Sequence, residues 1–101
     1  MAWSTGIYVT QPKYSLEQQV TIIIHNGEND AIGLVDVPPW TIKNAQDEII
    51  FPMIRSHMAK MLDPHYSTLY FWDQKDIHGV QVPTGKYVVS WEKYKAAFEI
   101  A

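Results

Sequence analysis

Short runs in which apolar and polar residues alternate recur along the chain, and turn-forming residues separate them. The most β-branched run is Val20–His25 (VTIIIH), whose alternation places its even-numbered residues on one face and its odd-numbered residues on the other. We expect this run to be a central strand. Gly6–Thr10 is shorter and ends at Gln11-Pro12, and it predicts an edge strand because proline cannot donate to an interior hydrogen-bond ladder.

The strongest β-type unit extends from Tyr66 to Trp91. The runs Leu69–Trp72 and Tyr87–Trp91 flank a polar segment rich in Asp, Gly and Pro, which is the pattern of two antiparallel strands joined by a long loop. Four more runs predict strands: Ala31–Val37, Thr41–Lys43, Glu48–Phe51 and Ala96–Ile100. We expect Thr41–Lys43 and Glu48–Phe51 to pair as a hairpin.

A single helix is expected at Arg55–Leu62 (RSHMAKML), where Met58, Met61 and Leu62 stand at helical spacing and Asp63-Pro64 follows as a stop. We interpret this segment as a short helical bridge between two sheets. The other segments give seven or eight short strands at intervals of about ten residues, without the repeated helices of βαβ units. This spacing is typical of an antiparallel β-sandwich.

The composition fits one globular domain, residues 1–101, with 47% hydrophobic and 19% charged residues. The mean hydropathy of -0.19, with no apolar run long enough to span a bilayer, predicts no membrane insertion. The net charge is -3, and the eight Lys and Arg residues are scattered along the sequence. Because nucleic-acid binding depends on clustered basic side chains, we expect no nucleic-acid partner.

Cysteine is absent, which excludes disulfides, thiolate metal sites and a cysteine nucleophile. Residues 1–6 (MAWSTG) lack the basic and apolar regions of a signal peptide. The compartment therefore stays open: cytoplasmic for the chain as written, extracellular if the domain comes from a secreted parent.

A spaced motif in the second half of the chain resembles the W-D-x-x-D-x-x-G-x-x-V-P-x-G-x-Y pattern of two groups of small immunoglobulin-like domains. These are the bacterial intracellular proteinase inhibitor domain and the Ig-like domain of flagellar hook-capping proteins. The resemblance implies an all-β, immunoglobulin-like antiparallel β-sandwich of seven or eight strands with one short helical bridge. The segment before the motif departs from the inhibitor pattern, since His65 replaces a usual glycine. The motif residues are Trp72, Asp73, Asp76, Gly79, Pro83, Gly85 and Tyr87.

The motif residues have structural roles that suffice to explain them. Asp73 and Asp76 suit side-chain-to-backbone hydrogen bonds within a long loop, Gly79 and Gly85 suit positive φ, and Tyr87 returns the chain to the core. We therefore expect this motif to identify the fold rather than an activity.

No arrangement of titratable residues has the spacing of a known reactive site. The four histidines, His25, His57, His65 and His78, with Asp63, Asp73 and Asp76, have neither zinc-helix nor EF-hand spacing. Ser56 and His57 are adjacent on one turn, about 100° apart if helical, and do not form a hydrolytic pair with Asp63. We therefore predict no cofactor, no metal and no enzymatic activity.

The remaining interpretation is a non-enzymatic protein-interaction or structural module, with a proteinase inhibitor or a carbohydrate-binding module as alternatives. The expected partner is another protein, bound by edge-strand pairing or homodimerisation. The partner-binding residues would come from the methionine-rich bridge and from exposed tryptophans, although core packing explains the same residues. They are Met53, Arg55, His57, Met58, Met61, Trp3 and Trp40.

Overall fold

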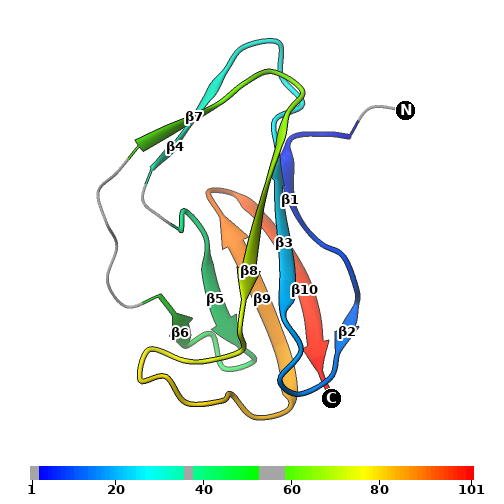
Figure 1. Ribbon diagram of the computed structural model, residues 1–101, viewed down its shortest axis with the longest axis vertical. Helices are drawn as coiled ribbons and strands as arrows, with labels where there is room; N and C mark the ends of the chain where they lie inside the picture. Colours follow the sequence, from blue (N-terminus) through cyan, green and yellow to red (C-terminus); the bar gives the residue numbers. More distant parts are fainter. Residues whose placement is uncertain (1–2, 36–37, 53–58) are drawn as a thin grey trace.

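The computed structural model describes residues 3–35, 38–52 and 59–101 and is all-β over these ranges, with no helix (Figure 1). The strands form a three-stranded sheet in the order β1-β3-β8, a five-stranded sheet in the order β2-β10-β9-β5-β6, and a two-stranded pair of β4 and β7. The strands are β1 (Gly6–Val9), β2 (Lys13–Tyr14), β3 (Val20–His25), β4 (Ile32–Val35), β5 (Thr41–Asn44), β6 (Ile49–Phe51), β7 (Ala59–Leu62), β8 (Ser67–Trp72), β9 (Gly85–Trp91) and β10 (Tyr94–Ile100).

The alternation in the sequence sets which side of each strand is buried. In β3 the even-numbered residues are buried and the odd-numbered residues are half-buried, which confirms the predicted division into two faces, and β3 is the central strand of its sheet, as predicted. The same period in β9 buries Tyr87, Val89 and Trp91 and leaves the residues between them on the outer side. Each of the two larger sheets therefore has an apolar face available for the core.

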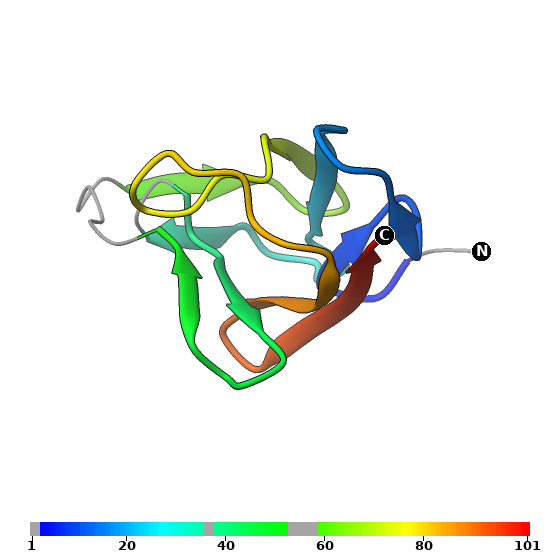
Figure 2. The same cartoon turned by 90° about the horizontal axis from the view of Figure 1, so that it is seen from below.

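The two larger sheets lie against each other, with the β9–β10 hairpin on one side and β3 and β8 on the other (Figure 2). Buried side chains from both sheets form one cluster, which includes Ile22 and Ile24 of β3, Ile42 of β5, Val89 of β9 and Ile100 of β10. Burying an aliphatic side chain of this size contributes about 1.5–3 kcal/mol. This shared core joins strands that are far apart in the sequence.

Aromatic rings carry the contact between the sheets near one end of the core. The ring of Trp72 on β8 lies 6.2 Å from the ring of Tyr87 on β9 and 6.3 Å from that of Phe98 on β10. Tyr87 and Phe98 stack at 6.0 Å, and Tyr14 of β2 meets Phe98 edge-on at 5.9 Å. Such pairs contribute about 0.5–1.5 kcal/mol each beyond their burial.

The predicted pairing of Leu69–Trp72 with Tyr87–Trp91 is wrong. These segments belong to β8 and β9, which lie in different sheets: β8 pairs with β3, and β9 pairs with β10 and β5. The local pattern identified each strand correctly, but a long loop leaves the pairing partner undetermined. The predicted hairpin of Thr41–Lys43 with Glu48–Phe51 is confirmed by the antiparallel pairing of β5 with β6.

The predicted helix at Arg55–Leu62 is not present where the structure describes this segment. Ala59–Leu62 forms β7, which pairs antiparallel with β4, so the spacing of Met61 and Leu62 reflects strand alternation, with Met61 exposed and Leu62 buried. Residues 53–58 lie outside the described residues. The strand β2, two residues long, was not predicted because Lys13-Tyr14 is too short to show a period.

The motif loop between β8 and β9 behaves as the sequence indicated. Asp76 accepts hydrogen bonds from the backbone N–H groups of His78 and Val80 at 2.8 and 3.0 Å, and Gly79 and Gly85 have φ of 77° and 153°. The Tyr87 hydroxyl donates to the Pro83 carbonyl oxygen at 2.6 Å, and burial raises the pKa of Tyr87 above its ordinary value.

A buried glutamine fixes this loop to the rest of the molecule. Gln74 is fully buried, and its Nε2 donates to the carbonyl oxygens of Ser15 and Gln18 at 2.7 and 2.6 Å. Its Oε1 accepts from Nε2 of Gln81 at 2.9 Å. The loop before β3 and the loop before β9 are thereby held together through one side chain.

We predict that Gln74→Ala lowers the free energy of unfolding by about 2–4 kcal/mol, because buried carbonyl oxygens lose their donors. The measurement is urea unfolding followed by tryptophan fluorescence. Gln46→Ala, which truncates an exposed glutamine, is the matched control and is expected to change stability by less than about 0.5 kcal/mol. Equal stabilities of the two variants would contradict this role of Gln74.

We predict that Asp76 makes stability depend on pH at the acid end. The backbone N–H of Val80 and then that of His78 lower the pKa of Asp76 below its ordinary value of 3.8. The ionised carboxylate therefore stabilises the fold fully above that value, and the contribution is lost as pH falls through the lowered pKa. Thermal unfolding of Asp76→Asn should differ most from wild type at neutral pH, and the curves should converge on acidification. A constant difference at every pH would refute the prediction.

Candidate functional site

The register of the five-stranded sheet gathers lysines that are distant in the sequence. Lys13 of β2 and Lys86 of β9 both pair with Glu99 of β10, one on each side of it. Lys43 of β5 pairs with Val88, two residues along β9 from Lys86, and Lys95 of β10 pairs with Ser90. All these residues occupy the strand positions opposite to the buried Tyr14, Tyr87, Val89 and Phe98. We call this outward surface, with Lys13, Lys43, Lys86 and Lys95, the lysine face.

The spacing of the lysine face follows from strand geometry. Lys13 and Lys86 stand two strands apart, which separates their Cβ atoms by about 10 Å at the usual interstrand distance. Lys43 is one strand and two residues from Lys86, or about 8 Å. The three lysines therefore form an irregular row across the sheet, and Lys95 lies toward the other end of the same face.

The lysine face has a charge opposite to that of the whole chain. Its strands carry four lysines against one outward carboxylate, Glu99, while the chain as a whole has eleven acidic and eight basic residues. Among the described residues, the ion pair formed is that of Lys43 Nζ with Asp47 Oδ1 at 3.4 Å. Lys13, Lys86 and Lys95 are exposed and available to an anionic partner.

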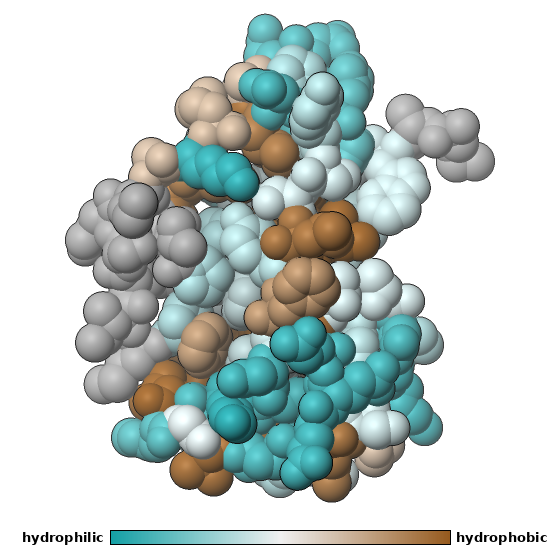
Figure 3. Space-filling model, viewed as in Figure 1, coloured by the Kyte–Doolittle hydropathy of each residue, from teal (hydrophilic) through white to brown (hydrophobic). Residues whose placement is uncertain are grey.

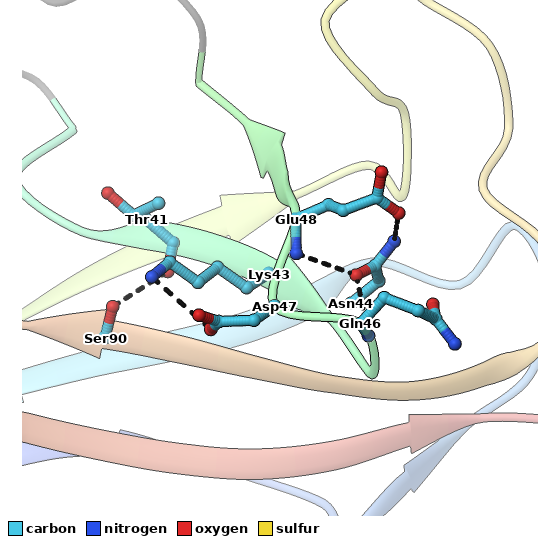
Figure 4. A network of polar contacts seen from close by, with 7 residues as sticks. All are labelled: Thr41, Lys43, Asn44, Gln46, Asp47, Glu48 and Ser90. Carbon is cyan, nitrogen blue, oxygen red and sulfur yellow. Dashed lines mark hydrogen bonds and ion pairs between the residues drawn. The ribbon is translucent and has the colours of Figure 1, made fainter.

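The turn between β5 and β6 borders the lysine face, since Asn44 and Ala45 line the same surface hollows as Lys86. Figure 4 shows the polar contacts within this turn. The Asn44 Oδ1 accepts from the backbone N–H groups of Gln46 and Glu48, both at 3.0 Å, and its Nδ2 donates to Glu48 Oε1 at 2.9 Å. The turn is thus fixed by its own side chains, and it directs Asp47 back toward Lys43.

Two hollows lie on either side of Lys86. The larger, 370 Å³, lies over Val88 and Ala97, with Pro12 and Ala45 among its lining residues, and includes Glu99. The smaller, 190 Å³, lies between the β5–β6 turn and residues 83–85. Both are lined by Asn44, Ala45, Lys86 and Tyr87, so they adjoin. The lysine face therefore combines cationic side chains with recessed, mainly apolar surface.

The opposite sheet has a different surface. Figure 3 shows apolar side chains across the middle of the β3–β8 side, where Leu69 and Phe71 are 56% and 59% exposed. The outward positions of β1, β3 and β8 carry no Lys, Arg, Asp or Glu. At the end of this surface the ring of Trp3 packs on Tyr8 at 4.8 Å and on His25 at 5.9 Å. The charged face and the apolar face of the molecule are thus on different sheets.

The partner-binding residues predicted from the sequence do not come together in the described structure. Met53, Arg55, His57 and Met58 lie outside the described residues. Met61 on β7 is 61% exposed, and Trp3 is 51% exposed on the three-stranded sheet. Trp40 is 2% exposed and packs against Phe51 and Tyr70, so it belongs to the core and is not one of the exposed tryptophans.

The histidines and aspartates of the metal hypothesis have separate surroundings. His25 Nδ1 lies 2.7 Å from Ser67 Oγ, and His65 Nε2 lies 3.2 Å from Asn29 Oδ1. Asp73 accepts from the backbone N–H of Lys75, within the motif loop that also holds Asp76. His57 and Ser56 lie outside the described residues. In the ranges that the structure describes, no group of three or more His, Asp or Glu side chains is arranged to hold a metal ion.

Sequence reasoning missed the lysine face because it counted basic residues along the chain. Lys43 is separated from the hairpin that carries Lys86 and Lys95 by three other strands in the sequence, and the pairing of β5 with β9 brings it onto the same sheet face. A partial signal did exist: Lys86 immediately precedes the alternating run Tyr87–Trp91, and Lys43 follows the buried Ile42. The pairing order of the strands was the missing information.

Within the described residues no helix is long and apolar enough to cross a membrane.

The chain matches no family model, and no curated protein matches it. Among solved structures it is similar to the Pseudomonas fluorescens alkylpurine DNA glycosylase AlkC bound to DNA containing an abasic site analog, with a TM-score of 0.58 and 14% sequence identity. The match covers 96% of this chain and 30% of that chain. At this identity the match establishes a shared fold, here with part of a longer protein.

This match corrects several predictions made from the sequence. We predicted a non-enzymatic interaction or structural module with proteinase-inhibitor and carbohydrate-binding alternatives, no enzymatic activity, and a protein partner rather than nucleic acid. The matched protein is a DNA-bound enzyme, and these predictions are therefore overturned. The resemblance to inhibitor and hook-capping domains stays a prediction. What the comparison adds is that a solved DNA-bound enzyme contains this β-fold as about a third of its length.

Proposed function

We propose that this domain binds DNA through the lysine face and serves as the DNA-contacting part of an enzyme that acts on DNA. The observation that carries the proposal is the strand register that places Lys13, Lys43, Lys86 and Lys95 on one outward surface of an otherwise acidic chain. The fold match to a DNA-bound glycosylase supports DNA as the polyanion.

Electrostatics supports a directed contact through this face. Phosphates attract lysine ammonium groups and release condensed counterions on binding, which gives affinity without sequence information. Without the four lysines of this face, Glu99 and Asp47, the sequence has four basic and nine acidic residues. This acidic remainder repels the same polyanion. A weakly acidic domain with a segregated basic surface therefore approaches DNA in one orientation.

The proposal takes an immunoglobulin-like sandwich as the scaffold. Two features support this architecture: the two larger sheets share one core, and the Tyr87 hydroxyl bonds to the Pro83 carbonyl oxygen four residues upstream. The second feature is similar to the tyrosine corner of such sandwiches, in which a hydroxyl returns to upstream backbone. The scaffold holds β9 and β10 rigidly, which fixes the positions of Lys86 and Lys95.

We predict that neutralising the lysine face weakens DNA binding in proportion to the charges removed. Lys86→Gln is expected to reduce affinity for a labelled duplex about tenfold at low salt and to lower the slope of log K against log salt by about 0.9. The double variant that combines Lys13→Gln with Lys86→Gln is expected to lower this slope by twice as much as Lys86→Gln alone. Lys43→Gln should have a smaller effect, because Lys43 is already paired with Asp47. Fluorescence anisotropy across a salt series gives both quantities.

The matched control is Lys60→Gln with Lys75→Gln, which removes two exposed lysines outside the lysine face. The control is expected to bind nearly as well as wild type. Equal losses in the control and in the Lys13, Lys86 variant would assign binding to net charge alone and refute the proposed site. Failure of the wild-type domain to bind DNA at low salt would refute the function itself.

A further inference from the structure

The hollows beside Lys86 contain surface that a phosphate backbone does not use. Val88 and Ala97, which line the larger hollow, and Pro12 and Ala45 at its sides are apolar. Paired DNA presents phosphates and sugars outward and keeps its base faces stacked inside, so on this surface it would contact the lysines and leave the recess unfilled. An unpaired strand presents both phosphates and flat apolar base faces.

The size and order of the two hollows fit successive nucleotides. The larger hollow, 370 Å³, is within the size range of small-molecule sites, and the smaller one, 190 Å³, adjoins it across Lys86 and Tyr87. A phosphate at the Lys86 ammonium would thus have a recess on each side of it. This arrangement matches the repeat of a single strand, in which each phosphate lies between two bases.

Glu99 provides a second, independent indication. It lies on the lysine face between Lys13 and Lys86 and also lines the larger hollow. A carboxylate at this place repels phosphates, but it accepts hydrogen bonds from the exocyclic amino groups of bases, as acidic side chains do from cytosine N4. Thymine has no exocyclic amino group. The hollow therefore has a polar group suited to a base edge, with cations on both sides of it.

We propose that the lysine face binds unpaired DNA, with bases in the two hollows, the intervening phosphate at Lys86, and Glu99 accepting from the amino group of a base in the larger hollow. This inference rests on the proposed function and specifies its substrate class. It has two consequences: unpaired DNA binds more tightly than a duplex of the same length, and cytosine is preferred over thymine.

The first test compares a single-stranded oligonucleotide with its duplex by fluorescence anisotropy, using the wild-type chain, Ala97→Ile and Thr21→Ile. Ala97 is an exposed residue of the larger hollow, and isoleucine there fills the recess without changing any charge. Thr21, at an outward position of β3 on the opposite sheet, is the matched control. We expect Ala97→Ile to remove the preference for the single strand and to leave duplex binding unchanged, while Thr21→Ile retains the preference.

The second test uses oligo-dC and oligo-dT of equal length. Loss of one hydrogen bond predicts that wild type prefers oligo-dC by about three- to tenfold. Glu99→Leu removes both the acceptor and the charge, so the preference should disappear while affinity for oligo-dT rises. This test does not depend on how Ala97→Ile folds, and circular dichroism of each variant checks the β-structure.

The outcomes separate this inference from the function on which it rests. Equal binding of single strand and duplex by wild type, or an unchanged preference in Ala97→Ile, overturns the inference and leaves DNA binding through the lysines intact. An unchanged cytosine preference in Glu99→Leu overturns the role of Glu99. Absence of binding to every oligonucleotide overturns the proposed function together with the inference.

Discussion

Aromatic packing between the two larger sheets is the constraint on which the other features of this domain depend. Trp72 of β8 contacts the stacked rings of Tyr87 and Phe98 from β9 and β10, which locks the hairpin against the opposite sheet. Because side chains alternate along a strand, the inward position of Tyr87 and Phe98 forces Lys86 and Glu99 outward, directly opposite each other. The core thus determines the chemistry of the surface.

The local arrangement of charge, rather than its total, decides what this molecule attracts. An excess of three negative charges at neutral pH argues against a polyanionic partner when charge is averaged over the sequence. The same residues folded into a sheet place four lysines on one surface with Glu99 among them. Interactions of exposed charges are screened beyond about 10 Å at moderate salt, so the potential close to this sheet face is set mainly by its own lysines, and the potential over the rest of the surface by the acidic remainder.

The fold accommodates function in surface positions that stability does not constrain. One fold can support many unrelated activities, so the match to part of a DNA-bound enzyme shows a shared fold, and any activity of this chain depends on its own residues. Here those residues are outward side chains of β2, β5, β9 and β10 together with the turn that Asn44 fixes. Because none of them is in the core, their chemistry can be changed with little effect on folding.

The sequence by itself determined the local structure. The period of two in Val20–His25 predicted the strand and which of its residues share a face, and the Asp and Gly residues of the motif loop predicted its turns, because these signals depend on near neighbours. The pairing of strands required tertiary structure: Leu69–Trp72 and Tyr87–Trp91 were expected to pair and instead lie in opposite sheets. Ala59–Leu62 became a strand because β4 was available to pair with it, which overrode a weak helical pattern.

The lysine face was not predicted from the sequence, again because strand pairing was unknown. Of its four lysines, only Lys43 lay within a strand predicted from the sequence, and their proximity depends on the order β2-β10-β9-β5, which no local pattern contains. Strand order is decided by which apolar faces share a core, and that is a property of the whole chain. The sequence therefore determined the alternation of sides in its longer strands, and the tertiary structure decided which sides of which strands form one surface.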